Sequence, residues 1–346
     1  SVNEEQLLTK GVVELRRKVM LLGLDGGTWR LLNPWVSENK LPVLRRIIDS
    51  GSIGILHSTI PCTTVPALPS LLTGLNPGNH GILSFIKSDG SPATIQDIRY
   101  PKIWNILDRH GLKSCVVGLR GTFPPERLNG VMISGSAPSE ESNYTYPEAL
   151  KKEIRFEDDK HEQKIFDLRS KKRDSTNRKR LVDLMIEQTE RRYEIFKKLA
   201  KDDQYDLSIF WIEETDNIQH WLWEYPDSLL QFYRRIDDIL KDILFTFSGR
   251  TLFIVSDHGF ESIPSMFFFI NTWLKKEGYL RQKGGAAIRL TDMVQFLALR
   301  NFRPLRLARI LAILNRLKQK RTLSQKCAIG QLYSPFIDKS KSEAYL

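Results

Sequence analysis

Residues 19–27 read Val19-Met-Leu-Leu-Gly-Leu-Asp-Gly-Gly27, an apolar run that ends at an aspartate and two glycines. A continuous apolar run of this length is typical of a strand buried on both faces of a parallel sheet. Asp25 therefore stands at the end of a predicted buried strand. Open α/β sheets place their binding sites at such strand ends.

Strand-like and helix-like segments alternate outward from this run. The predicted strands are 19–24, 53–56, 115–119, 206–212 and 251–256, and the predicted helices are 42–50, 67–73, 103–110, 180–199 and 228–247. Strands that alternate with helices indicate βαβ units. The sequence therefore predicts an α/β fold with a mostly parallel central sheet flanked by helices, and with helical insertions or a cap.

The composition excludes several classes of protein. The 346 residues are 41% hydrophobic and 27% charged, unlike a disordered tail or a fibrous repeat. The three cysteines (Cys62, Cys115 and Cys327) form neither a disulfide framework nor a zinc ribbon, and they indicate a reducing, cytoplasmic compartment. The first ten residues lack the apolar stretch of a signal peptide, and no apolar run approaches the ~18 residues of a membrane span.

The formal net charge of +11 comes from one segment. Residues 281–326 hold twelve of the 52 Lys and Arg and one of the 41 acids, so the rest of the chain carries 40 of each. Such a surplus attracts a polyanion. The candidates are a phosphorylated substrate and an anionic membrane surface, with the protein peripheral at the membrane. Nucleic acid is disfavoured because the segment contains no recognised module.

Four regions are predicted along the chain. Residues 18–150 and 205–280 form the α/β core. Residues 151–204, crowded with both signs of charge, form a charged helical insertion or cap joint that we expect to be solvated. Residues 281–335 form a basic helical cap with an apolar stripe, in which Pro304 can start a helix. Residues 336–346 would start a return to the core.

Polar residues that can hold a metal follow three of the predicted strands. Asp25 follows the first, and the pair Asp257-His258 directly follows another. Asp216 and His220 come just after a third, and their i, i+4 spacing on a helical turn points both side chains at one cation. Because all lie at strand ends, they form a candidate two-metal centre.

A fourth stretch, Pro61-Cys-Thr-Thr-Val-Pro66, leads into the apolar helix predicted over 67–73. A threonine there, Thr63 or Thr64, lies at a helix N-terminus, where free N–H groups and the helix dipole stabilise an anion. A hydroxyl nucleophile at an anion site, beside three Asp and two His, indicates attack on a phosphate ester.

Each of these elements also has a purely structural interpretation. An aspartate after a strand can be a turn residue, Gly259 can serve a tight turn, and both threonines can be caps. Asp216 and His220 can be a surface pair. The joint occurrence of all four stretches at strand ends, in a chain with six histidines, favours the functional interpretation. We expect His80 to fix its loop and the other three histidines to be packed or solvated: His57, His110 and His161.

Five stretches resemble the alkaline phosphatase superfamily. They are Gly23-Leu-Asp-Gly-Gly-Thr28, Thr64-Val-Pro-Ala67, Leu72-Thr-Gly-Leu-Asn-Pro-Gly-Asn-His-Gly-Ile82, Glu214-Thr-Asp-Asn-Ile-Gln-His220 and Val255-Ser-Asp-His-Gly-Phe260. Within the superfamily the chain is most similar to the type I phosphodiesterase/nucleotide pyrophosphatase group and its prokaryotic relatives predicted to be phosphohydrolases or phosphomutases. The order and spacing agree from residue 18 to residue 280.

The resemblance implies an alkaline phosphatase-like fold and two divalent metal ions, zinc or manganese. By position, Asp25, Asp257 and His258 would hold one metal, and Asp216 and His220 would hold the other.

The resemblance also implies that Thr64 is the nucleophile, because the family's nucleophile stands two residues before the proline that here is Pro66. Its attack on a phosphoryl group would give a covalent phospho-threonine, which water then displaces. A bound cation lowers the pKa of a hydroxyl, which agrees with the chemistry expected from the residues alone. The expected substrate is a phosphorylated small molecule or a nucleotide.

Two positions depart from the pattern of the group. Ala67 stands where an Asn commonly follows the proline and helps to bind a phosphate oxygen. No histidine follows His258, although the second metal normally takes another His from a downstream motif. The chain is therefore expected to lack the C-terminal part of the pattern as a truncated or split form, or else another residue or subunit completes the site, or the second metal is weakly held.

Three functions follow as hypotheses. The first is a metal-dependent phosphate-ester hydrolase, diesterase-like because the nucleophile is a threonine. The second is a phosphomutase or phospho-headgroup transferase, which needs a cap that excludes water. The third is a degenerate or split member that acts as a binding protein, because the last metal-binding His is absent.

Overall fold

The computed structural model describes residues 17–85, 87, 91–135, 137, 139–156, 158–202, 204–262 and 270–280. Contacts divide the chain into one compact unit of residues 1–83 and 94–262 and a second of residues 84–93 and 263–346. The described part of the second unit includes α11 (Ile270–Lys276) and a turn in which the N–H of Lys87 donates to the carbonyl of Ser91. The predicted basic cap and the residues after it lie outside the described residues, so these assignments stay predictions.

One six-stranded sheet organises the first unit, in the order β4-β3-β2-β5-β1-β6. The strands are β1 (Val19–Leu24), β2 (Ser114–Leu119), β3 (Gly130–Ser134), β4 (Thr145–Tyr146), β5 (Leu207–Ile212) and β6 (Thr251–Val255). Every pair of neighbours is parallel except β3 and β4. The predicted α/β fold with a mostly parallel central sheet is therefore confirmed.

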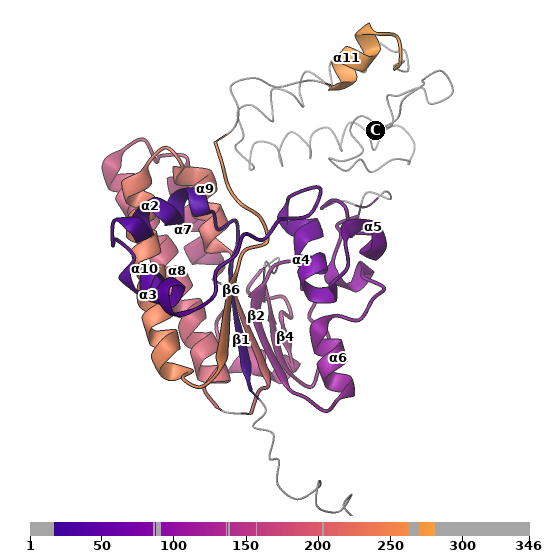
Figure 1. Cartoon of the computed structure of the whole chain (residues 1–346), viewed down its shortest axis with the longest axis vertical. Helices are drawn as coiled ribbons and strands as arrows, with labels where there is room; N and C mark the ends of the chain where they lie inside the picture. The colour runs from indigo at the N-terminus through magenta and orange to yellow at the C-terminus, as the bar shows by residue number, and fades with distance from the viewer. Residues whose placement is uncertain are drawn as a thin grey trace, which may run out of the picture. The chain divides into compact units, whose positions relative to one another are not determined.

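Helices cover both faces of this sheet. The α-helices of the unit are α2 (Trp29–Ser37), α3 (Pro42–Ser50), α4 (Thr64–Thr73), α5 (Pro77–His80), α6 (Ile103–Arg109), α7 (Asp159–Arg169), α8 (Ser175–Ala200), α9 (Glu214–Leu222) and α10 (Pro226–Thr246), and two 3₁₀ turns span Ile95–Asp97 and Glu148–Lys152. Figure 1 shows α2, α3 and α7 to α10 on one side of the sheet and α4 to α6 on the other. None of the described helices is long and apolar enough to cross a membrane.

The charged segment 151–204 is helical, but its main helix is part of the core. α8 packs on β2 and β5 and against α7, α9 and α10. Ten of its 26 residues are buried, including Leu181, Met185 and Phe196. The helix is amphipathic, so its charges lie on the outer face while the apolar face covers the sheet. The expectation of a solvated insertion does not hold for α8, whose apolar face is buried.

The strand predicted over 53–56 does not form. Ile53, Ile55 and Leu56 are 56%, 78% and 67% exposed, and no strand of the described chain pairs with them. An apolar run becomes a strand only where a neighbouring strand satisfies its backbone groups. Here the run instead lines a groove beside the edge strand β6.

A glycine in the central strand allows the closest packing in the sheet. Gly23 of β1 lies beside Trp211 of β5. A Cβ built on Gly23 would stand 1.8 Å from Cε3 of the indole, so the ring occupies the space of the missing side chain. Because alternate residues along an extended chain share a face, the ring then reaches Asp25, which lies two residues beyond Gly23 and directly follows β1.

We predict that Gly23→Ala lowers the free energy of unfolding by about 1–3 kcal/mol, because the new methyl group displaces a buried tryptophan. Urea unfolding followed by tryptophan fluorescence measures the change. Gly54→Ala is the matched control, since a Cβ there meets nothing within 4 Å. Equal stability of the two variants would contradict the packing described for Trp211.

Candidate active site

Four parallel strands bring charged side chains to the same edge of the sheet. The pairs Leu24–Ile212 and Gly23–Val255 place the carboxyl ends of β1, β5 and β6 side by side. β2 pairs with the other side of β5. The residues that follow these four strands are Asp25, Arg120, Glu213 and, one residue later, Asp257. This edge therefore gathers Asp25 and Asp257, which the sequence predicted as site residues, together with Arg120 and Glu213, which it did not.

Asp25 is a fully buried carboxylate at the centre of this edge. The indole N–H of Trp211 donates to its Oδ2 at 3.1 Å, and the hydroxyl of Thr215 donates to its backbone carbonyl at 2.7 Å. These two bonds hold the carboxylate at the end of β1. Its Oδ1 accepts a hydrogen bond of 3.3 Å from the hydroxyl of Thr64.

Thr64 is the first residue of helix α4 and is 4% exposed. Its Oγ1 lies 3.0 Å from Nε2 of His258 as well as 3.3 Å from Asp25. Thr63, the residue at the N-cap, is exposed and makes no side-chain capping bond. The hydroxyl that faces the acidic edge is therefore that of Thr64, at the positive end of a helix dipole.

His258 presents a free lone pair to Thr64. Its Nδ1 lies 2.8 Å from the backbone carbonyl of Gly259, and a carbonyl can only accept. In the neutral ring Nδ1 therefore carries the proton and Nε2 does not. Nε2 lies 3.5 Å from Oδ1 of Asp25 and 3.6 Å from Oδ2 of Asp257. This tautomer suits either acceptance of a proton or coordination of a metal.

Asp257 and Gly26 join the ends of β6 and β1. The N–H of Gly26 donates to Oδ1 of Asp257 at 3.2 Å, while Oδ2 of the same carboxylate is buried without a hydrogen-bond partner. Gly26 has a φ of +64°, and a Cβ there would stand 3.0 Å from Asp216 Oδ1 and 3.3 Å from His258 Cε1. The glycine thus leaves the space between these two side chains open.

Asp216 and His220 lie on one face of α9, as their spacing predicted. Nε2 of His220 is 3.3 Å from Oδ1 of Asp216, although this oxygen makes no geometrically satisfied hydrogen bond. Asp216 is 4% exposed, whereas the His220 side chain is 61% exposed. The ring of Phe260 packs edge-on against His220 with centroids 4.7 Å apart. This contact orients the imidazole from outside the site.

The clustered carboxylates perturb one another's pKa values. Burial, followed by repulsion from Asp257, raises the pKa of Asp25 to about 7, although Arg120 opposes the shift. The pKa of Asp257 is raised, mainly by burial. Burial also acts to raise that of Asp216, but His220 and Arg120 outweigh it and the pKa lies below its usual range. In the absence of a cation, the site therefore favours a proton on Asp25.

Two arginines that the sequence analysis missed balance part of this charge. The Nε of Arg120 donates to Glu213 at 3.3 Å, and Nη1 of Arg192 lies 2.6 Å from Glu213 and 2.7 Å from Glu214. Arg120 follows β2 directly, so the strand-end rule that selected Asp25 also applies to it. No comparable pattern marked Arg192, because it lies in a helix rich in charged residues, and such a helix resembles a solvent-exposed one.

His80 fixes its loop, as expected. Its Nδ1 accepts from the N–H of Ile82 at 3.2 Å, and its Nε2 lies 2.9 Å from the hydroxyl of Ser70 on α4. Burial lowers the pKa of the imidazole. His161 bonds the carbonyl of Leu184, and His57 is exposed. These histidines, together with the exposed His110, lie outside the acidic edge.

The donor set fits a divalent cation. Ligand atoms of Asp25, Asp216 and His258 all lie within 4.8 Å of one another. The buried oxygens that lack hydrogen-bond partners, Oδ2 of Asp257 and Oδ1 of Asp216, belong to the same cluster. Carboxylate oxygens and an unprotonated imidazole nitrogen are the donors that zinc and manganese accept. A cation here would satisfy oxygens that the chain leaves unpaired.

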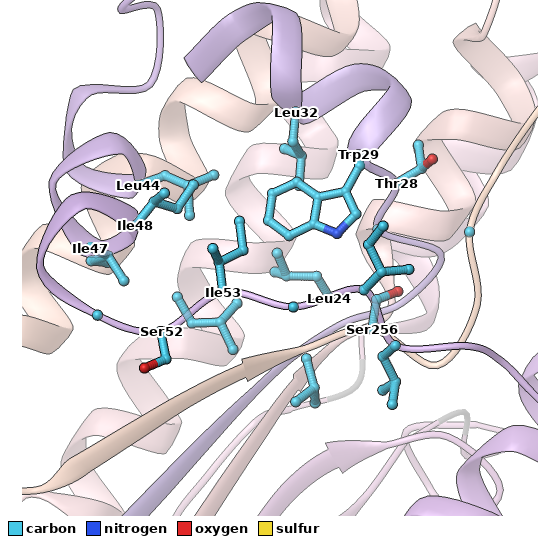
Figure 2. A pocket seen from close by; sticks show the side chains of 18 of the residues that line it. Leu24, Thr28, Trp29, Leu32, Leu44, Ile47, Ile48, Ser52, Ile53 and Ser256 are labelled. Atoms are coloured by element: carbon cyan, nitrogen blue, oxygen red, sulfur yellow. The ribbon is translucent and has the colours of Figure 1, made fainter. Parts of the chain in front are cut away.

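An apolar groove of about 610 Å³ borders the site. Figure 2 shows Leu24, Trp29, Leu32 and Ile53 around it, with the side chains of Thr28 and Ser256 nearby. His258 also lines the groove, and no Lys or Arg does. Among the described residues, the Lys and Arg side chains that could contact a phosphate therefore lie outside the groove.

The sequence profile of type I phosphodiesterase / nucleotide pyrophosphatase matches residues 19–326. The chain belongs to this family. The match spans all the strand ends described above and agrees with the predicted resemblance. The chain matches no curated protein sequence.

This member of the phosphodiesterase family shares its fold with proteins of known structure. The phosphonoacetate hydrolase of Sinorhizobium meliloti 1021 matches with TM-scores of 0.50 (phosphonoformate complex, 18% identity) and 0.52 (phosphonoacetate complex, 17% identity), over 79% and 78% of this chain. An inactive variant of murine ectonucleotide pyrophosphatase/phosphodiesterase 5 with AMP gives 0.48 at 16% identity over 78%. The chain covers 59% to 64% of the lengths of these structures. The two matches to the phosphonoacetate hydrolase agree with the expected alkaline phosphatase-like fold, which is confirmed.

We predict that Asp25→Asn raises the melting temperature of the metal-free protein by several degrees at pH 8. The pKa of this carboxyl is about 7 in the fold and 3.8 in the unfolded chain, so keeping it buried costs stability progressively as the pH rises from 3.8 to about 7, and the cost is complete above that pH. The variant removes this cost. Calorimetry in the presence of a chelator measures the difference, which should shrink as the pH falls toward 5. A pH-independent difference would contradict the raised pKa.

Proposed function

We propose that this chain is a phosphate-ester hydrolase in which Thr64 is the nucleophile. The observation that carries the proposal is the position of Thr64 Oγ1, 3.0 Å from His258 and 3.3 Å from Asp25 at the first turn of α4. Membership of the phosphodiesterase/nucleotide pyrophosphatase family supports this assignment. The substrate class that follows is a phosphorylated small molecule or a nucleotide.

The ligands of two metal ions are also part of the proposal. Asp25, Asp257 and His258 would hold one ion beside Thr64, and Asp216 and His220 would hold the other. Zinc and manganese both suit these donors. When bound, the ions would lower the pKa of the threonine hydroxyl and offset the charge of the phosphoryl group.

The residues of the chain then act in a fixed order. Thr64 releases its proton to solvent water, because Asp25 and His258 would be held by the ion, and its oxygen attacks phosphorus in line with the leaving alcohol, which takes up a proton from water as it departs. The P–O bond to that alcohol breaks as the bond to Thr64 forms, which gives a phospho-threonine. Attack by water on phosphorus returns the hydroxyl and releases phosphate or a phosphate monoester. The N-terminus of α4 stabilises the negative oxygens throughout.

We predict that Thr64→Ala lowers the rate of hydrolysis of p-nitrophenyl phosphomonoesters and of bis-(p-nitrophenyl) phosphate by roughly 10³-fold or more, because the nucleophile is lost. Both rates are measured in the presence of zinc or manganese. Release of p-nitrophenol measures the rate. The matched control is Thr63→Ala, which removes a hydroxyl one residue away that is exposed and caps nothing.

Metal-dependent activity that survives in Thr64→Ala, or that falls equally in Thr63→Ala, would refute this nucleophile. An accompanying phosphorus NMR experiment with an added acceptor alcohol separates hydrolysis from the phosphomutase or transferase alternative. Transfer of phosphate to the alcohol instead of to water would favour that alternative. Failure of the wild-type chain to bind metal in calorimetry would favour the binding-protein alternative.

A further inference from the structure

Arg120 places a guanidinium at the acidic edge, beside the proposed metal ligands. Its Nε donates to Glu213 at 3.3 Å and lies 3.8 Å from Oδ2 of Asp25, and its Nη1 lies 3.6 Å from Oδ2 of Asp216. The side chain is 19% exposed. Glu213, Asp25 and Asp216 together hold a positive charge at a fixed point of the site.

Most of the hydrogen-bonding capacity of Arg120 is unused. Within the described part of the chain, only its Nε makes a hydrogen bond, although a guanidinium carries five N–H donors. None of its nitrogens is fully buried without a partner. Arg192 differs, because its side chain is 4% exposed and its Nη1 is occupied by Glu213 and Glu214. Of these two arginines, Arg120 is the one with donors available to a molecule in the site.

Beyond the hydroxyl of Thr64, the described first turn of α4 provides no side-chain donor for the oxygens of a phosphoryl group. Ala67, which follows Pro66 in the first turn of α4, is apolar and 5% exposed. Pro66 itself has no N–H, so the helix start offers one fewer backbone donor to an anion than an ordinary helix start does. Two adjacent N–H groups of a guanidinium match two oxygens of one phosphate.

We propose that Arg120 binds the non-bridging oxygens of the substrate's phosphoryl group, with Glu213 holding the guanidinium in place. The inference rests on the proposed function and adds a substrate preference to it. A terminal phosphate carries two negative charges, whereas a diester carries one. A fixed cation with unused donors therefore favours phosphate monoesters over diesters in binding.

The test uses calorimetric titration of the zinc-loaded protein with inorganic phosphate. We expect Arg120→Met to weaken phosphate binding roughly 10- to 100-fold, and Arg120→Lys to fall in between, because lysine keeps the charge but not the paired donors. Zinc affinity should stay within a few-fold of wild type in both variants. Arg30→Met is the matched control: Arg30 is 62% exposed and pairs with Glu261, so its loss changes the net charge equally.

A kinetic measurement supplies a second readout. Arg120→Met should raise KM for p-nitrophenyl phosphate more than KM for bis-(p-nitrophenyl) phosphate, a split that a merely structural role would not produce. Should Arg120→Met fail to fold, as judged by thermal melting, Arg120→Lys decides the question.

Three outcomes would overturn the proposal. They are phosphate affinity in both Arg120 variants equal to wild type, a wild-type chain that binds no phosphate, and loss of zinc binding in both variants, which would make Arg120 a support for the metal ligands. Absence of ester hydrolysis in the wild type would instead refute the proposed function, since phosphate binding is measured independently of turnover.

Discussion

The burial of one carboxylate at the end of the central strand governs this structure. Asp25 is fully buried, and a buried charge destabilises a fold unless it is paired or hydrogen-bonded. Trp211 and Thr215 hold it in position, and Trp211 can do so only because Gly23 leaves room for its ring. The identity of a glycine two residues earlier in β1 therefore decides where the carboxylate points.

The same edge carries more negative charge than the described residues around it neutralise. Five buried carboxylates, Asp25, Asp216, Asp257, Glu213 and Glu214, stand against the two guanidiniums of Arg120 and Arg192. Desolvation makes such a surplus costly, which is why the pKa of Asp25 is raised. The cluster is thus poor for stability in the absence of a cation and well suited to hold one. A functional site explains why the chain retains it.

Much of the fold could be predicted from the sequence because burial leaves a simple pattern. The apolar run at 19–24 forms β1 within the predicted bounds, since a strand covered on both faces has no polar positions. Prediction of the fold from the sequence was weaker for segments whose residue types occur both on the surface and in the core. The charges of α8 indicated a solvated segment, yet its apolar face covers β2 and β5. The apolar run at 53–56 found no partner strand and stayed exposed.

The sequence by itself determined which residues could reach the site. Asp25 and Asp257 stand at strand ends, and Asp216 and His220 share a helical turn, so their local positions follow from chain periodicity. Only the tertiary structure decided which side chains converge. It turned the hydroxyl of Thr64 toward His258, and it left the donors of Arg120 available while Arg192 is occupied. Such choices depend on the register of β1 against β5 and β6 and on the packing of α4 and α8, and no local pattern encodes the distance between segments far apart in the chain.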